Sequence, residues 1–294
     1  MTPDSDGQLR LCLGQVSAQV DLLGGELRSL RRGNDEVLWQ NESGVWPHAA
    51  PILFPFVGRL KGGGFKHRDK YFQMPIHGFA GHSRFEVEPV SGGHCVVLHL
   101  RDSLQTQACY PFKFQLRVSF VLNPQGIDVG YTVFNEGAEV LPFALGSHPA
   151  FALGSGRLQD WKVEFDQHEA PEVYRLDAGL LAERPQAFCF DPVRSIGLQP
   201  ETFVADALIF KHVNSTWISL VHKQLGPRLR LWTGGAPHLG LWAPAGADFV
   251  CIEPWFGVDE DAQACVDLAE KSGLQRLAPG ARFACGYRIE FAAH

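Results

Sequence analysis

The stretch that decides the fold is residues 113–136, KFQLRVSFVLNPQGIDVGYTVFNE. Apolar and polar side chains alternate over residues 114–122 and again over residues 127–133, as on two strands that each bury one face. Between the two runs lies Asn123-Pro124-Gln125-Gly126, whose residue types favour a tight turn. The stretch therefore predicts two paired antiparallel strands.

The same period-two pattern recurs along the chain, with clusters of Gly, Pro, Asn and Asp between the runs. It predicts strands at Leu9–Val20, Gly25–Arg31, Phe85–Val90, Cys95–Arg101, Trp161–Phe165, Ala207–Lys211, Thr216–His222, Arg228–Trp232, Leu239–Trp242, Phe249–Glu253 and Phe283–Ala292. Asp259–Lys271 is the stretch that favours a short helix. Many short strands, few helical stretches, and 31 Gly plus 19 Pro are typical of a large antiparallel β-sandwich, so we predict an all-β fold.

Length and composition are those of a folded globular chain, with 294 residues of which 45% are hydrophobic. No linker-like or low-complexity stretch divides the sequence, so we expect residues 1–294 to form a single domain. The net charge of −6 and the scattered basic residues make nucleic acid and anionic membranes poor partners. The polar start, Met1–Gly7, and the lack of a long apolar run predict a cytoplasmic protein, which we expect to be a monomer or homodimer.

The seven cysteines are widely spaced, and no two of them form a C-x-x-C pair. Several lie in apolar, strand-like runs, which is typical of reduced and buried cysteines. Cys251 lies two residues before Glu253, on the same face of the predicted strand, but this pattern supplies no activating histidine. We therefore interpret Cys251 as a small apolar residue rather than a nucleophile.

Glu253 is an acidic residue inside the apolar and aromatic stretch FVCIEPWFG, residues 249–257. A buried carboxylate there needs a partner, because its desolvation is costly. His77 in PIHGFA and His148 in LGSHPAF each follow apolar residues beside Gly or Pro, and Arg59 follows the run LFPFVG. Such a set supplies a base, a proton donor and a hydrogen-bonding clamp, which is what opening a sugar ring requires.

Tryptophans suit the apolar faces of a pyranose ring. The candidates for this role are Trp46, Trp232, Trp242 and Trp255.

A metal site is not predicted. A His-x-His pair is absent, and the pairs His77/His82 and His94/His99 have odd offsets, which place the partners on opposite faces of a regular strand. We therefore expect neither a metal nor another cofactor.

Taken together, these motifs resemble the aldose 1-epimerase (mutarotase) family of the galactose-mutarotase-like superfamily, in its bacterial branch with LFPxxGR, HGF and CIEPW signatures. The matching segments run in order along nearly the whole chain: Gly24–Leu27, Leu38–Gln40, Ala50–Arg59, His77–Phe79, Gly146–Phe151, Asp206–Phe210, Leu239–Trp242 and Cys251–Trp255. The resemblance implies a β-supersandwich and an isomerase that interconverts the α and β anomers of a free hexose by metal-free acid–base catalysis.

The resemblance also implies a role for each matching site residue. Glu253 would be the general base on the C1 hydroxyl, and His148 the general acid on the ring oxygen. His77 would assist catalysis and, with Arg59, bind the ring side of the sugar, while Asp206 would accept hydrogen bonds from sugar hydroxyls. These roles need an ionised Glu253 and a protonated His148, a state that their proximity would favour.

Two alternatives stay open. A hexose-6-phosphate 1-epimerase would use the same chemistry with a phosphate site, for which Lys61–Lys66, KGGGFK, is the Gly-rich basic loop. The branch often carries Arg after HGFA, whereas this chain has Gly81-His82, which argues against an anionic sugar. A non-catalytic sugar-binding or sensory protein could keep the same fold, but the Glu and both His stand at the matching positions.

Overall fold

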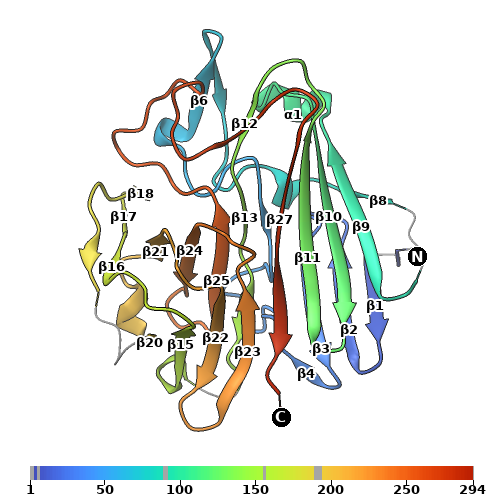
Figure 1. Cartoon of the computed structure of the whole chain (residues 1–294), viewed down its shortest axis with the longest axis vertical. Helices are drawn as coiled ribbons and strands as arrows, with labels where there is room; N and C mark the ends of the chain where they lie inside the picture. The colour runs from blue at the N-terminus through green and yellow to red at the C-terminus, as the bar shows by residue number, and fades with distance from the viewer. Residues whose placement is uncertain (1–2, 5–6, 89–91, 155–156, 189–193, 294) are drawn as a thin grey trace.

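The computed structural model describes residues 3–4, 7–88, 92–154, 157–188 and 194–293. Its sheets are antiparallel and strands dominate its regular structure, which confirms the predicted all-β class (Figure 1). The end of the predicted strand Phe85–Val90, Cys189 and part of Met1–Gly7 lie outside the described residues.

The largest sheet has nine strands and extends across the molecule. Its order is β20 (Ser195–Gly197), β15 (Trp161–Phe165), β22 (Trp217–His222), β23 (Gly226–Trp232), β27 (Arg282–Phe291), β11 (Gly126–Asn135), β10 (Phe114–Asn123), β9 (Cys95–Arg101) and β8 (Glu86–Glu88). The hairpin predicted from residues 113–136 is confirmed, because β10 pairs with β11 from Phe114↔Asn135 to Asn123↔Gly126. Strand β27, near the C-terminus, lies between β23 and β11 and joins the two parts of the sheet.

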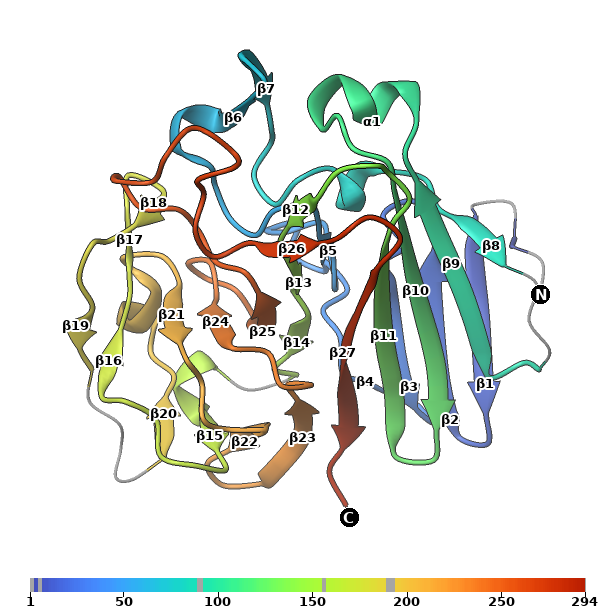
Figure 2. The same ribbon diagram turned by 45° about the horizontal axis from the view of Figure 1, so that its top comes forward.

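A four-stranded sheet formed by the start of the chain packs against β10 and β11, as both ribbon views show (Figure 2). Its strands are β1 (Gln8–Leu13), β2 (Val16–Asp21), β3 (Leu27–Arg32) and β4 (Asp35–Glu36). The predicted strand Leu9–Val20 is therefore a hairpin. Its chain reverses at Gly14, whose φ of 58° lies in the left-handed region that glycine adopts without steric cost.

A six-stranded sheet carries the candidate site. Its order is β21 (Leu208–Lys211), β24 (His238–Trp242), β25 (Phe249–Phe256), β13 (Leu145–Ser147) and β5 (Ile52–Leu53), with β14 (Ala150–Ala152) also paired to β25. Strand β25 is thus central, with neighbours on both sides.

Short hairpins and turns complete the fold. The pairs are β6 (Gly64–His67) with β7 (Lys70–Gln73), β12 (Leu141–Phe143) with β26 (Gln275–Leu277), β16 (Glu172–Val173) with β19 (Gln186–Ala187), and β17 (Leu176–Asp177) with β18 (Leu180–Leu181). The helical segments are α1 (Leu104–Cys109), η1 (Lys61–Gly63), η2 (Ala80–His82), η3 (Leu158–Asp160) and η4 (Pro200–Phe203). Within the described residues, no helix has the length and apolar character needed to cross a membrane.

The predicted helix at Asp259–Lys271 is wrong. This segment consists of turns and isolated bridges. The side chains of Asp261 and Asp267 accept hydrogen bonds from the backbone N–H groups of Gln263 and Ala269, which competes with helical hydrogen bonding. An ion pair between Lys271 and Glu260 then closes the segment on itself.

Candidate active site

Every second side chain of strand β25 points to the same side of its sheet. Because side chains alternate along a strand, Phe249, Cys251, Glu253 and Trp255 share a face. Phe249 and Cys251 pack in an aromatic cluster, while Glu253 and Trp255 line the adjoining cavity. The carboxylate that the sequence singled out therefore lies between an apolar cluster and an open pocket.

His148 lies opposite Glu253, in the short link between β13 and β14. Strands β13 and β14 pair with β25 in one continuous register, through Gly146↔Trp255 and Ala150↔Cys251, which places His148 across from Glu253. The distance from His148 Nε2 to Glu253 Oε2 is 3.2 Å. Both residues are buried, with 8% of His148 and 1% of Glu253 exposed.

The backbone around His148 is fixed from both sides. The His148 N–H donates to the Pro51 carbonyl at 3.1 Å, and the preceding Ser147 hydroxyl lies 2.6 Å from the Tyr131 hydroxyl. These contacts hold the short link between β13 and β14, so the imidazole is presented from a rigid support.

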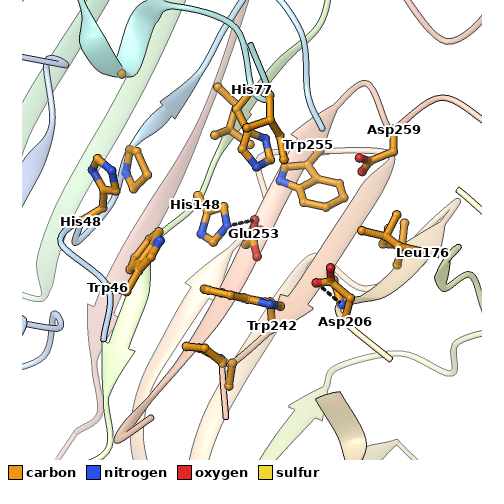
Figure 3. A pocket seen from close by; sticks show the side chains of 18 of the residues that line it. Trp46, His48, His77, His148, Leu176, Asp206, Trp242, Glu253, Trp255 and Asp259 are labelled. Atoms are coloured by element: carbon orange, nitrogen blue, oxygen red, sulfur yellow. Dashed lines mark hydrogen bonds and ion pairs between the residues drawn. The ribbon is translucent and has the colours of Figure 1, made fainter. Parts of the chain in front are cut away.

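A cavity of about 660 Å³ opens above this pair. In Figure 3 the side chains of His148 and Glu253 meet near its centre, with Trp46 and His48 on one side and Asp206 and Asp259 on the other. Trp46, Trp242 and Trp255 line the cavity, and the ring of Trp46 lies 4.9 Å from that of His148. Aromatic faces of this kind suit the C–H faces of a sugar.

Trp232 does not lie at the cavity, although the sequence suggested it as a stacking residue. It is on β23, 37% exposed, with the Arg288 guanidinium over its ring. The Gly-rich segment Lys61–Lys66 also lies elsewhere, as η1 and the start of β6.

His77 lines the cavity with its tautomer set by the backbone. The Gly58 N–H donates to His77 Nδ1 at 3.0 Å, so the proton of the neutral ring is on Nε2. Burial, together with the positive charge of Arg59, lowers the pKa of His77 to about 4. His77 therefore stays a neutral hydrogen-bond donor at physiological pH.

Two aspartates line the side of the cavity away from Trp46. Asp206 is exposed and accepts a hydrogen bond from the Ala207 N–H. Asp259 is buried, and its carboxylate accepts the Arg59 N–H at 2.9 Å. Burial raises the pKa of Asp259 to about 6. This carboxylate fits only because residue 58 is glycine, since a Cβ there would lie 1.8 Å from Asp259 Oδ1.

Arg59 is the predicted site residue that the structure does not place in the cavity wall. Its backbone adjoins the site, but its side chain is exposed and its Nε lies against Gly179, in the turn between β17 and β18. The other four predicted residues, Glu253, His148, His77 and Asp206, all line the same cavity.

Comparison of the chain with known proteins shows which family it belongs to. A sequence model described as aldose 1-epimerase matches residues 8–290. The chain belongs to the aldose 1-epimerase family. Protein LacX from Lactococcus lactis subsp. lactis is 27% identical over 277 residues, which cover 90% of this chain and 92% of LacX.

Solved structures show the same fold. A galactose mutarotase related enzyme from Lactobacillus acidophilus superposes with a TM-score of 0.90 at 28% identity, covering 97% of both chains. A galactose mutarotase-like protein from Lactobacillus casei also gives a TM-score of 0.90, at 24% identity, over 97% of this chain and 100% of its own. The galactose mutarotase-like fold expected from the sequence is thereby confirmed.

Burial affects Glu253 and His148 of this aldose 1-epimerase family member in a way that the sequence did not suggest. Burial and the negative charge of Asp259 raise the pKa of Glu253 well above its usual range. Burial also lowers the pKa of His148 well below its usual range. These effects favour a protonated Glu253 beside a neutral His148, not the ionised pair, although both forms hold a single transferable proton.

Cys251 lies closer to this family member's candidate machinery than the sequence indicated. One ligand atom each from Cys251, His148 and Glu253 lie within 4.8 Å of one another. The strand pattern alone supplied no histidine for Cys251, whereas the fold brings His148 beside it from the link between β13 and β14, about 100 residues earlier in the chain. Burial, with Glu253 nearby, raises the pKa of the Cys251 thiol well above its usual range, so it is a poor nucleophile at neutral pH.

Proposed function

We propose that this family member is an aldose 1-epimerase that interconverts the α and β anomers of a free, neutral hexose. The observation that carries the proposal is the pair of Glu253 and His148, 3.2 Å apart at the base of a cavity lined by tryptophan. A carboxylate and an imidazole this close to each other can reach the hydroxyl and the ring oxygen of a hemiacetal together, because both oxygens are bonded to C1.

The reaction needs two coupled proton transfers. Glu253 takes the proton of the C1 hydroxyl while His148 gives a proton to the ring oxygen, and the ring opens to the free aldehyde. Rotation about C1–C2 exposes the other face of the aldehyde. Closure with the transfers reversed then gives the other anomer and regenerates the starting pair.

The proton count of the pair suits this cycle. Ring opening converts ionised Glu253 and protonated His148 into protonated Glu253 and neutral His148. The pair thus holds one transferable proton before and after this step, and the sugar neither gains nor loses a proton overall. A sugar hydroxyl that donates to Glu253 would favour its ionised form, which burial alone disfavours. Substrate binding would thus prepare the base.

The remaining residues would bind the sugar. Neutral His77 would donate from Nε2, and Asp206 would accept from sugar hydroxyls. Trp46, Trp242 and Trp255 would cover the C–H faces. Arg59 would reach a hydroxyl only if its guanidinium turned from Gly179 toward the cavity.

The charge of the cavity supports a neutral sugar over a sugar phosphate. Among the described residues that line it are the carboxylates Asp206, Glu253 and Asp259, and neither Lys nor Arg. A phosphate site normally gathers Arg, Lys or a helix N-terminus. The carboxylates would repel a phosphate instead.

An NMR exchange assay of anomer interconversion tests the proposal. It compares glucose, galactose, mannose and other neutral aldoses with their 6-phosphates, each with and without enzyme. We expect faster exchange for at least one neutral aldose and little or none for its 6-phosphate. If no sugar in the panel exchanges faster with the protein, the proposal is wrong.

The substitution Glu253→Gln tests the assigned base. Because the amide cannot take a proton, we expect exchange to fall by about 10²- to 10⁴-fold. Sugar binding, followed by fluorescence of the cavity tryptophans, should stay within a few-fold of wild type. Glu164→Gln, which removes a carboxylate on β15 that pairs with Lys162 on the same strand, is the control and should keep full activity. Unchanged turnover in Glu253→Gln would exclude this residue as the base.

A further inference from the structure

Cys251 has a position that the proposed reaction does not use. Its side chain is fully buried on the same face of β25 as Glu253, and His148 adjoins both from the link between β13 and β14. The Cys251 Sγ, a ring nitrogen of His148 and a carboxylate oxygen of Glu253 lie within 4.8 Å of one another. A thiol, an imidazole and a carboxylate thus converge on one point.

These three groups are the ligand types that zinc prefers. Tetrahedral zinc, with bonds of about 2.0–2.3 Å, places neighbouring ligand atoms about 3.3–3.8 Å apart. The 3.2 Å between His148 Nε2 and Glu253 Oε2 is close to that spacing. The Cys251 Sγ lies within 4.8 Å of both of these ligand atoms, so an approach of at most about 1.5 Å brings it to the tetrahedral spacing.

The surroundings leave the cluster open to an ion. Among the described residues, the buried Glu253 Oε2 has no hydrogen-bond partner besides its 3.2 Å ion pair with His148 Nε2, so an ion that binds both atoms replaces that one contact. His148 and Glu253 line the cavity, which gives an ion access from their side and room for a water or a sugar hydroxyl as the fourth ligand, while Cys251 closes the cluster on its buried side. Three protein ligands with one open position are the arrangement of an accessible zinc site.

We propose that His148, Cys251 and Glu253 bind a zinc ion and that the bound ion inhibits the enzyme. Zinc at this point occupies the lone pairs of both Glu253 and His148, so neither can transfer a proton. Binding displaces two protons to solvent, that of the Cys251 thiol and the one that Glu253 and His148 hold between them, and removal of the ion restores the free pair. The inhibition rests on the proposed function, whereas the binding does not.

The thiol makes the site selective among ions. A thiolate and an imidazole favour Zn²⁺ and Co²⁺ over Mg²⁺ and Ca²⁺, which prefer oxygen ligands. Cys251 is also the ligand that can be removed without touching the acid–base pair. The variant Cys251→Ala therefore separates metal binding from catalysis.

Direct binding is measured first, by competition of the metal-free protein with a chromophoric chelator for Zn²⁺. We expect wild type to bind one ion that Cys251→Ala binds at least about 100-fold more weakly. Co²⁺ should give wild type a thiolate-to-cobalt charge-transfer band that the variant lacks. Cys265→Ala is the matched control, since that thiol also contacts a carboxylate, that of Glu270, and should bind as wild type does.

Activity is measured second, in the anomer exchange assay. Micromolar Zn²⁺ should inhibit wild type reversibly, and Cys251→Ala should keep the basal rate and resist zinc. Equal zinc affinity in wild type and Cys251→Ala would overturn the proposal, as would a wild type that binds no zinc. If Cys251→Ala does not fold, Cys251→Ser, which keeps the side-chain size, is compared in the same cobalt spectrum. A protein that binds zinc through Cys251 but converts no sugar would refute the proposed function and leave the site standing.

Discussion

The ring of His77 has its protonation state determined by its neighbours before any substrate arrives. The Gly58 N–H donates to Nδ1, and burial beside Arg59 lowers the pKa of the ring to about 4. The backbone of His77 has a φ of 63°, which is uncommon for a residue other than glycine. His77 is thus fixed as a donor and does not exchange protons between pH 5 and 8.

We therefore predict that His77→Asn lowers kcat/KM by about 100-fold, as for loss of one preorganised donor, without changing the shape of the pH–rate profile. The profile should instead follow the one-proton state of Glu253 and His148, falling at low pH when both are protonated and at high pH when neither is. His82→Asn, at another histidine of the cavity, should stay within a few-fold of wild type. A shifted limb between pH 5 and 8 in His77→Asn would mean that His77 titrates there.

Besides three tryptophans, the sequence identified four polar residues that share the cavity, because each carries a local signal. Glu253 stands out in an apolar strand, and His77, His148 and Asp206 lie in motifs that resemble the family's. Asp259 was missed. Its place depends on contact with Gly58, about 200 residues earlier, and no local pattern reports such a contact.

At the level of elements, the site depends on what flanks β25. Gly240 of β24 lies opposite Glu253, and Gly146 of β13 lies opposite Trp255. A Cβ at residue 240 would lie 2.5 Å from Trp255 Cζ2, and one at residue 146 would lie 2.7 Å from its Cδ1. The indole thus lies across the sheet over both glycines, and their missing side chains make room for it.

The predicted strand Phe249–Glu253 stops short of the observed one, because β25 continues through Pro254 to Phe256 although proline has no N–H to donate to a ladder. Pro254 lies opposite Ser147, between the residues of β13 and the residues of β14 that pair with β25. The sheet therefore needs no N–H from residue 254 on the side of β13 and β14. The sequence could not indicate this exception, since it depends on which distant strands pair with β25.

We predict that Gly240→Ala displaces the Trp255 indole and lowers kcat/KM by at least about tenfold, because a small displacement of a group that positions the substrate can lower the rate severalfold or more. The overpacking itself should reduce the free energy of unfolding by about 1–3 kcal/mol, so the protein stays folded. Gly93→Ala is the control, since a Cβ there meets nothing within 4 Å. Exchange assays and urea denaturation of both variants give the comparison. Wild-type activity in Gly240→Ala would show that Trp255 has no part in binding.

At the scale of the whole molecule, period-two patterning predicted the strands well but not how they assemble. Strands such as Cys95–Arg101 and Trp161–Phe165 have their predicted bounds. The position of β27 between β23 and β11 depends instead on pairing between segments far apart in the sequence. The false helix at Asp259–Lys271 has the same origin, because aspartate side chains and distant bridges set its conformation.

The acid stability of the fold should depend on His238, on β24 outside the cavity. Burial, with the positive charges of His212 and Lys211 nearby, lowers its pKa from 6.5 to about 4. Between these values the unfolded chain binds a proton at residue 238 that the folded chain does not, so stability falls as pH falls. Linkage gives a loss of about 2 kcal/mol between pH 7 and pH 5 from this group alone.

We predict that His238→Gln removes this loss, so that its free energy of unfolding falls by about 2 kcal/mol less than that of wild type between pH 7 and pH 5. Urea denaturation at both pH values measures the difference. The comparison isolates His238 from groups such as Asp259, whose raised pKa acts in the opposite direction and is common to both proteins. His94→Gln, at an exposed histidine, should keep the wild-type dependence, and an equal loss in His238→Gln and wild type would show that His238 is not buried in its neutral form.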